Sequence, residues 1–215
     1  MKNLLLLLGL LATFCISVPA ADLSVYAFSG PLAANTNTNL TYTANIMNAS
    51  TNSGETNNST LTFKFIGGQT FVSLTKPGSW TCTTPSVGVA GTVTCTNSAF
   101  PQTKLWQPSE SVNLNEFRYA STPNGHWFKA TTAGTTGSSE PSWNTSSGGT
   151  TSDGSAVWTE QGTDTFTLVV KIPTGTPTWT WTDVYATISF VPTASSPPDP
   201  CNENDRIDAP TRVNN

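Results

Sequence analysis

Apolar and polar residues alternate with a period of two in five segments of this chain. Each segment presents one apolar face and one face of Thr, Asn or Ser, as a β-strand with one buried side requires. The apolar positions are Leu23, Val25, Ala27; Leu40, Tyr42, Ala44, Ile46; Leu61, Phe63, Phe65; Phe166, Leu168, Val170, Ile172; and Val184, Ala186, Ile188, Phe190. Gly, Pro and Asn clusters separate these segments. Seven or eight short strands at this spacing predict an all-β fold, an immunoglobulin-like antiparallel β-sandwich of two sheets.

The alternation fades across residues 105–162, where Gly, Ser and Thr dominate. Four of the seven tryptophans nevertheless fall in this stretch: Trp106, Trp127, Trp143 and Trp158. A disordered linker would be poor in aromatic residues, and a structureless connection of this length inside a compact domain would be unusual. We therefore expect residues 105–162 to form a small inserted β-module with its own aromatic core.

The start of the chain has the pattern of a secretory signal peptide. Lys2 gives a positive charge, an apolar run extends from Leu4 to Val18, and small residues precede a cleavage site after Ala20. The apolar run is about 15 residues long, whereas a membrane-spanning helix needs about 20. No later segment is apolar enough to enter a membrane. We expect a secreted or cell-surface protein with no membrane span after cleavage.

These patterns divide the chain into five parts. They are a signal peptide (1–20), the first part of the sandwich (21–104), the inserted β-module (105–162), the second part of the sandwich (163–199) and a polar, loose C-terminal tail (200–215).

Export permits disulfides, and three cysteines follow the signal. Cys82 and Cys95 lie in two β-prone runs that a turn-rich stretch separates, so the ends of the two strands should face each other. We predict a disulfide between them, worth about 3 kcal/mol on the loop-entropy model. Cys201 is left over and is either free or paired with another molecule.

Solubility must come from hydroxyl and amide groups, because Thr, Ser and Asn make up 79 of the 215 residues and only 22 residues are charged. The net charge of −4 provides no basic surface and argues against nucleic acid as a partner. One histidine and few acids argue against a cofactor, a metal site or an active site. Asp199, Glu203, Asp205 and Asp208 lack the central Gly of an EF-hand loop and are expected to be solvated.

The ionisable residues of the module also fit structural roles. His126 follows the turn residues Asn124 and Gly125, and no nucleophile motif lies nearby. Glu140 and Asp153 could form a glycosidase pair. However, Glu140 precedes a proline and Asp153 begins an Asp-Gly turn, so we predict a non-catalytic protein.

Two tryptophans of the insert are candidate ligand-binding residues. Trp143 lies in a loop rich in Gly, Ser and Pro, where its ring could stack on a sugar or could simply close the module. Trp127 and Phe128 point to opposite faces of a strand, and we expect Phe128 to be inside. Trp106 and Trp158 bracket the insert and are expected to meet in its core.

Trp179 and Trp181 alternate with threonines on one face of a probable strand. Exposed, they would form a patch for a partner; buried, they would anchor the sheet beside the insert. We expect partial burial.

The sandwich segments resemble the conserved bacterial surface-repeat domain of unknown function, an immunoglobulin-like module. The resemblance is carried by Asp22–Val25, Leu40–Thr43, Phe71–Leu74, Trp80–Cys82, Gly91–Cys95 and Phe166–Val170. It implies a domain of cell-surface proteins without assigned catalytic residues.

The insert resembles a short aromatic-rich module of phage-tail and bacterial exported proteins, distantly similar to chitin- and cellulose-binding modules. The matching residues are Trp106, Thr122–Phe128, Ala133–Gly137, Glu140–Trp143, Gly148–Thr150 and Asp153–Trp158. This resemblance implies carbohydrate binding. The sequence thus predicts a structural or adhesive surface protein whose partner is another surface protein or a polysaccharide, with glycan binding by the insert as the alternative.

Overall fold

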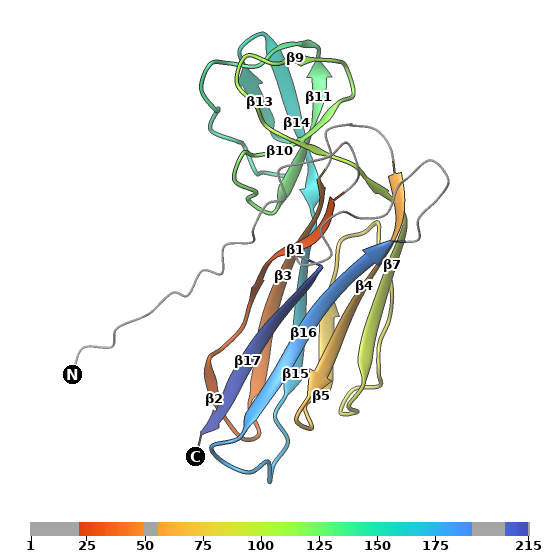
Figure 1. Cartoon of the computed structure of the whole chain (residues 1–215), viewed down its shortest axis with the longest axis vertical. Helices are drawn as coiled ribbons and strands as arrows, with labels where there is room; N and C mark the ends of the chain where they lie inside the picture. The colour runs from red at the N-terminus through yellow and green to blue at the C-terminus, as the bar shows by residue number, and fades with distance from the viewer. Residues whose placement is uncertain (1–21, 50–55, 191–204, 215) are drawn as a thin grey trace, which may run out of the picture.

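The computed structural model describes residues 22–49, 56–190 and 205–214, and these are built from strands, turns and loops. An elongated body of long strands carries a small module of shorter strands at one end (Figure 1). The predicted fold class, a β-sandwich with a small inserted β-module, is therefore confirmed. Within these ranges the chain contains no helix that could cross a bilayer. The expected signal peptide, Asp199, Cys201 and Glu203 lie outside the described residues.

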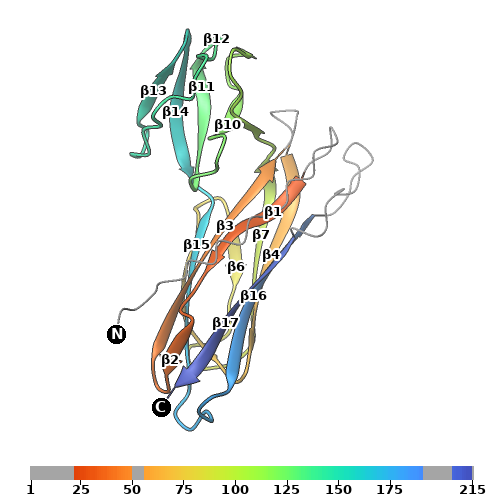
Figure 2. The ribbon, with the colours of Figure 1, turned by 60° about the vertical axis from the view of Figure 1, so that its left-hand side comes forward.

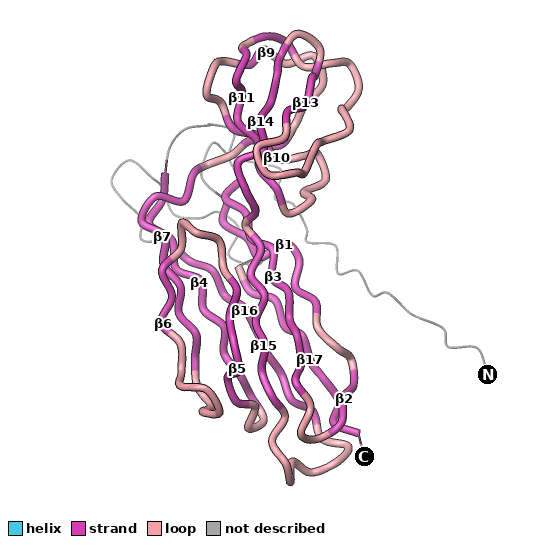
Figure 3. Tube along the Cα trace, turned by 180° about the vertical axis from the view of Figure 1, so that it is seen from behind, coloured by secondary structure: helices cyan, strands magenta, loops and turns pink. Residues whose placement is uncertain are grey.

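The sandwich has one sheet of four strands and one of six. The smaller sheet has the order β1 (Asp22–Ser29), β3 (Asn39–Ala49), β15 (Thr165–Lys171), β5 (Thr70–Thr75). The larger has the order β2 (Ala33–Asn35), β17 (Arg206–Asn214), β16 (Trp181–Phe190), β4 (Thr56–Ile66), β7 (Thr92–Pro101), β6 (Thr81–Thr83). All neighbours pair antiparallel except β17 and β2. Figure 3 shows the same body from behind.

The inward side chains of both sheets form one hydrophobic core, as the alternation predicts. In β15, for example, Phe166, Leu168 and Val170 are fully buried, whereas the residues between them are partly exposed. The ring of the buried Trp80 packs edge-on against Phe100 and Phe166, with centroids 5.3 Å away in both cases. Edge-to-face contacts of this kind stabilise by roughly 1 kcal/mol each beyond the area that they bury.

A β-bulge alters the predicted face of the first strand. Leu23 and Val25 are buried as expected, but the pairing of β1 with β3 shifts between Val25 and Ala27. After this shift Phe28, and not Ala27, packs against the core. One extra residue moves every following side chain to the other face, and alternation in the sequence does not reveal where this happens.

The prediction of a loose tail over residues 200–215 is wrong for residues 206–214, which form β17. This strand lies between β16 and β2, and its inward residues Ala209 and Val213 join the core. Its third inward residue, Thr211, is polar and exchanges a 2.7 Å hydrogen bond with the buried Tyr42 hydroxyl. The second part of the sandwich therefore extends well beyond residue 199.

The predicted disulfide between Cys82 and Cys95 is confirmed. The two cysteines are directly opposite each other in the pairing of β6 with β7. Cys95 is fully buried and Cys82 packs against the core, so the bond fixes the short edge strand β6 to the sandwich.

The inserted unit consists of residues 104–163, which we call the β-module. Its main sheet has the order β13 (Thr150–Asp153), β14 (Ala156–Thr163), β11 (His126–Thr132), β10 (Phe117–Tyr119), β8 (Lys104–Leu105). A second, two-stranded sheet pairs β12 (Gly134–Thr135) with β9 (Ser111–Val112). The β-module has its own buried cluster around Phe128 and Trp158. Figure 2 shows these strands beyond the ends of β3 and β7.

Both ends of the β-module are held against the same strand of the sandwich. The Thr103 amide donates to the Asn48 carbonyl at 2.9 Å, and the Ile46 amide donates to the Asp164 carbonyl at 3.1 Å. Because Ile46 and Asn48 are two residues apart on β3, the two chain crossings are separated by about 7 Å. The sandwich can therefore accept the insert without a break in its own sheets.

Candidate functional site

Trp143 closes the inner face of the β-module. Its ring stacks on Phe128 at a centroid distance of 4.3 Å and meets the edge of Trp158 at 6.0 Å. Phe128 is fully buried, as predicted, and Trp143 is half-buried. The loop that carries Trp143 therefore covers the cluster, although its composition is that of an open surface loop.

Glu140 fixes this loop. Its carboxylate accepts the Trp143 Nε1–H at 2.8 Å, the Ser121 amide at 2.7 Å and the Ser121 hydroxyl. Partial burial acts to raise the pKa of Glu140, but these hydrogen bonds outweigh it and lower the pKa below its usual value. A general acid needs a raised pKa, so the position of Glu140 suits a structural acceptor and not a proton donor.

Asp153 joins the two ends of the β-module. Its Oδ2 accepts the indole N–H of Trp106 at 2.9 Å and that of Trp158 at 3.0 Å, and its Oδ1 accepts the Gly137 amide at 2.7 Å. All three side chains are buried, which confirms the predicted core role of the two tryptophans. The carboxylate has no open face for a substrate. Asp153 and Glu140 are thus each engaged by different structural partners.

A cluster of charges around the buried Arg118, which the sequence did not reveal, is formed by β8, β10 and the segment between them. Arg118 is fully buried and pairs with Glu116 at 2.5 Å and with Glu110 at 3.0 Å, while Lys104 pairs with both glutamates at 3.3 Å. Burial acts to raise the pKa of Glu116, but a hydrogen bond from the Asn113 amide and the two cations lower it. These four residues lie within one stretch of 15 residues (104–118), where they look like ordinary surface charges.

His126 is also tied to a carboxylate. Its Nδ1 lies 2.9 Å from Glu160 Oε1, and Glu160 Oε2 accepts the Gly148 amide at 3.1 Å. Glu160 is buried and His126 is mostly buried. The pair connects β11, β14 and the loop before β13.

The second predicted binding residue, Trp127, lies on the opposite face of the sheet from Trp143. Phe128, the next residue, points into the inner cluster, so Trp127 points outward beside Phe117, with the two rings edge to face at 5.3 Å. Trp127, Phe117 and Lys129 are all half-buried. The two predicted ligand-binding tryptophans therefore do not form a single surface.

The expectation that Trp179 and Trp181 are partly buried beside the insert is wrong. Each is 63% exposed, and they lie where the β15–β16 loop enters β16, at the end of the sandwich away from the β-module (Figure 1). Thr182 and Val184 take the inward positions of β16, which leaves Trp181 facing solvent.

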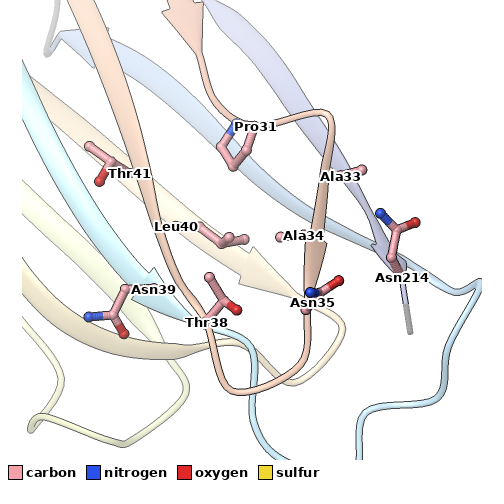
Figure 4. A pocket seen from close by; sticks show the side chains of 9 residues that line it. All are labelled: Pro31, Ala33, Ala34, Asn35, Thr38, Asn39, Leu40, Thr41 and Asn214. Atoms are coloured by element: carbon pink, nitrogen blue, oxygen red, sulfur yellow. The ribbon is translucent and has the colours of Figure 1, made fainter. Parts of the chain in front are cut away.

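An open pocket of about 560 Å³ lies near the same end, between β2, the start of β3 and the end of β17 (Figure 4). Its lining residues are Pro31, Ala33, Ala34, Asn35, Thr38, Asn39, Leu40, Thr41 and Asn214. None of these side chains is ionisable, so the pocket offers no acid or base. Among the residues that the structure describes, no group of three or more His, Cys, Asp or Glu side chains could hold a metal ion.

Comparisons with known proteins give remote similarities of structure. The sixth cohesin of Acetivibrio cellulolyticus scaffoldin B, solved with a mutant Cel5 dockerin, is 7% identical, with a TM-score of 0.38; 90% of this chain and 99% of that chain are covered. A cohesin module from a Clostridium perfringens family 33 glycoside hydrolase is 6% identical with a TM-score of 0.41, over 92% and 98%. The major pilin subunit of Bacillus cereus is 11% identical with a TM-score of 0.37, over 90% of this chain and 39% of that one.

No protein-family model matches the chain, and no curated protein matches it in sequence. Structural similarities at this level establish neither a family nor a partner. The two family resemblances of the sequence therefore stay predictions, and the functional argument depends on the residues of this chain.

Proposed function

We propose that this chain is an exported, non-catalytic contact protein. The disulfide-linked sandwich is the scaffold, and residues 105–162 form a separate unit that makes the contact with another surface protein or a polysaccharide. The two chain crossings on β3 support this division, because they connect the unit to the sandwich at one place. The separate aromatic cluster of the β-module supports it as well.

The observation that carries the proposal is the engagement of the acids of the β-module. Glu110, Glu116, Glu140, Asp153 and Glu160 all bind groups of the β-module itself. A hydrolase needs carboxylates that face a substrate and differ in pKa. Here the carboxylates hold loops and strands in place, which suits a rigid surface presented to a partner.

Two experiments test this function. Cell fractionation should find the chain outside the cytoplasm. A full-length soluble protein that stays in the cytoplasm would contradict export. In the second, residues 105–162 are replaced by a short Gly-Ser linker, which the closeness of the two crossings permits. The shortened chain should fold, as circular dichroism can verify, and should lose binding to cell envelopes that the full chain retains.

Glycan binding by the β-module is the second candidate function. It is favoured by the outward position of Trp127, whose half-exposed ring lies beside the ring of Phe117 and could stack on a sugar. Trp143 is also half-exposed, but its N–H and one ring face are already used. Trp127→Ala should weaken retention on a polysaccharide column and lower the melting temperature only slightly, because the half-buried ring loses its edge contact with Phe117. Trp143→Ala should weaken retention too, and it should also lower the melting temperature because it uncovers the cluster.

A further inference from the structure

The largest aromatic groups that the sandwich exposes lie at the end opposite the β-module. Trp179 and Trp181 are 63% exposed, and neighbouring Leu32 is 73% exposed. The β15–β16 loop that leads to them is at the lower end of the molecule in Figures 1 and 2. Neither tryptophan contributes to the core of the sandwich, so their positions need another explanation.

The backbone around these rings is fixed by β17. The Trp179 amide donates to the Val213 carbonyl at 2.7 Å, and the Val213 amide donates to the Thr180 carbonyl at 2.9 Å. Trp181 pairs directly with Arg212, whose own amide donates to the Leu32 carbonyl at 2.9 Å. The two indoles are thus presented from an ordered backbone and not from a loose loop.

Trp179 is held in a conformation that a bulky residue rarely adopts. Its φ of 65° lies in the left-handed region, where Gly or Asn would be less strained. The guanidinium of Arg212 lies 4.9 Å from the centre of its ring. A strained backbone that exposes a large apolar ring next to a cation is typical of a binding surface.

We propose that Trp179, Trp181 and Arg212 form a platform that binds a neutral polysaccharide. The flat indoles match the apolar C–H faces of pyranose rings, and the guanidinium can donate hydrogen bonds to sugar hydroxyls. This platform is distinct from the β-module and does not depend on the function proposed for it.

The exposed area favours a sugar over a protein partner. Two indoles at this exposure offer about 300 Å², whereas a stable protein interface needs about 800 Å² from each side. The local charges favour a neutral polymer over an acidic one. Asp183 follows Trp181 on the same face of β16, and Asp208 is near enough to Asp183 to raise its pKa further after the effect of burial. Asp208 is paired with Arg206 at 3.0 Å, so Asp183 is the acid that offsets Arg212, and the platform offers no excess positive charge to a polyanion.

The test is affinity electrophoresis of the whole chain in native gels that contain a soluble polysaccharide. Hydroxyethylcellulose, glycol chitin and mannan are the neutral probes, and carboxymethylcellulose is the acidic one. At least one neutral polymer should retard the protein more than carboxymethylcellulose does. Trp181→Ala should weaken the association roughly tenfold and Trp181→Tyr clearly less, because a ring remains.

Two controls separate stacking from general stickiness and from the β-module. Leu32→Ser removes an exposed apolar side chain without a ring and should leave the retardation unchanged. Trp127→Ala removes the candidate ring of the β-module, and the loss of retardation caused by Trp181→Ala should be the same in this background as in the wild type. Trp179 and Trp181 are exposed, so their variants should melt at the wild-type temperature. Equal retardation of the wild type and a Trp179→Ala/Trp181→Ala double variant would overturn the proposal. So would the absence of retardation by every neutral polymer, or sedimentation that shows Trp181-dependent pairing of two copies.

Discussion

Replacement of Asp164 by asparagine should remove a pH dependence from the stability of this protein. Asp164 connects β14 to β15, where the β-module meets the sandwich, and it is 5% exposed. Burial raises the pKa of its carboxyl to about 7, against the opposing effect of the hydrogen bond from the Tyr119 hydroxyl, 2.9 Å from Oδ2. Burial also raises the pKa of Tyr119 and of neighbouring Tyr26, so both hydroxyls stay neutral in this range.

The sign and size of this pH dependence follow from the pKa of the Asp164 carboxyl in the unfolded and the folded chain. The unfolded chain loses this proton near pH 3.8 and the folded chain near pH 7. Between these values the folded state holds more protons, so the free energy of unfolding falls as the pH rises. The stabilisation by the protonated Asp164 carboxyl is fully present below pH 3.8 and is lost as the pH rises through about 7. The loss between pH 5 and pH 8 is about 3 kcal/mol.

Urea unfolding followed by tryptophan fluorescence at several pH values can measure this change. Between pH 5 and pH 8 the free energy of unfolding of the wild type should fall by about 3 kcal/mol more than that of Asp164→Asn. Other groups, such as Asp183, whose pKa burial also raises, contribute to both proteins and cancel in the difference. The lowered pKa values of Glu116 and Glu140 affect stability at lower pH, where their contribution is lost on acidification.

Tyr119→Phe is the matched variant. It removes the hydrogen bond that lowers the pKa of Asp164 while it keeps the ring, so the decline in stability should extend to higher pH. Parallel pH profiles of the wild type and Asp164→Asn would refute the reasoning, because they would show that the carboxyl ionises alike in both states.

Two further changes should have separable effects on stability. Replacement of Cys82 and Cys95 by serine removes a short cross-link and should lower the free energy of unfolding by about 3 kcal/mol, measured by urea titration. As a control, dithiothreitol should lower the free energy of unfolding of the wild type by the same amount. Asp153→Ala leaves two indole N–H groups and an amide without their acceptor and should cost about 3 kcal/mol or more. Hydrogen exchange should then rise in the β-module and not in the sandwich, and uniform exchange throughout the chain would contradict this.

The fold was predictable because most sandwich strands bury every second side chain. β17 was not, because its inward Thr211 is satisfied by Tyr42, a partner 169 residues away. The outward Arg212 and Pro210 made the segment look like a polar tail. Only the paired sheet shows that this threonine can be buried at little cost.

The candidate site was less predictable because loop composition does not specify long-range contacts. Trp143 is half-buried since it meets Phe128, fifteen residues earlier in the chain. Arg118 is buried with two glutamates, Glu110 and Glu116, that no pattern in the sequence marks as its partners. Trp181 seemed close to the insert in sequence. However, β15 carries the chain about 23 Å along the sandwich before the loop that leads to it.

The central claim, that the β-module makes the contact, is tested most directly by bead adhesion. Beads would carry either the full chain or the chain with residues 105–162 replaced by a Gly-Ser linker, both in the Trp179→Ala/Trp181→Ala background so that the sandwich platform cannot contribute. The account predicts that the full chain attaches to immobilised cell envelopes and that the shortened chain attaches at least tenfold less. Equal attachment of two correctly folded proteins would contradict it.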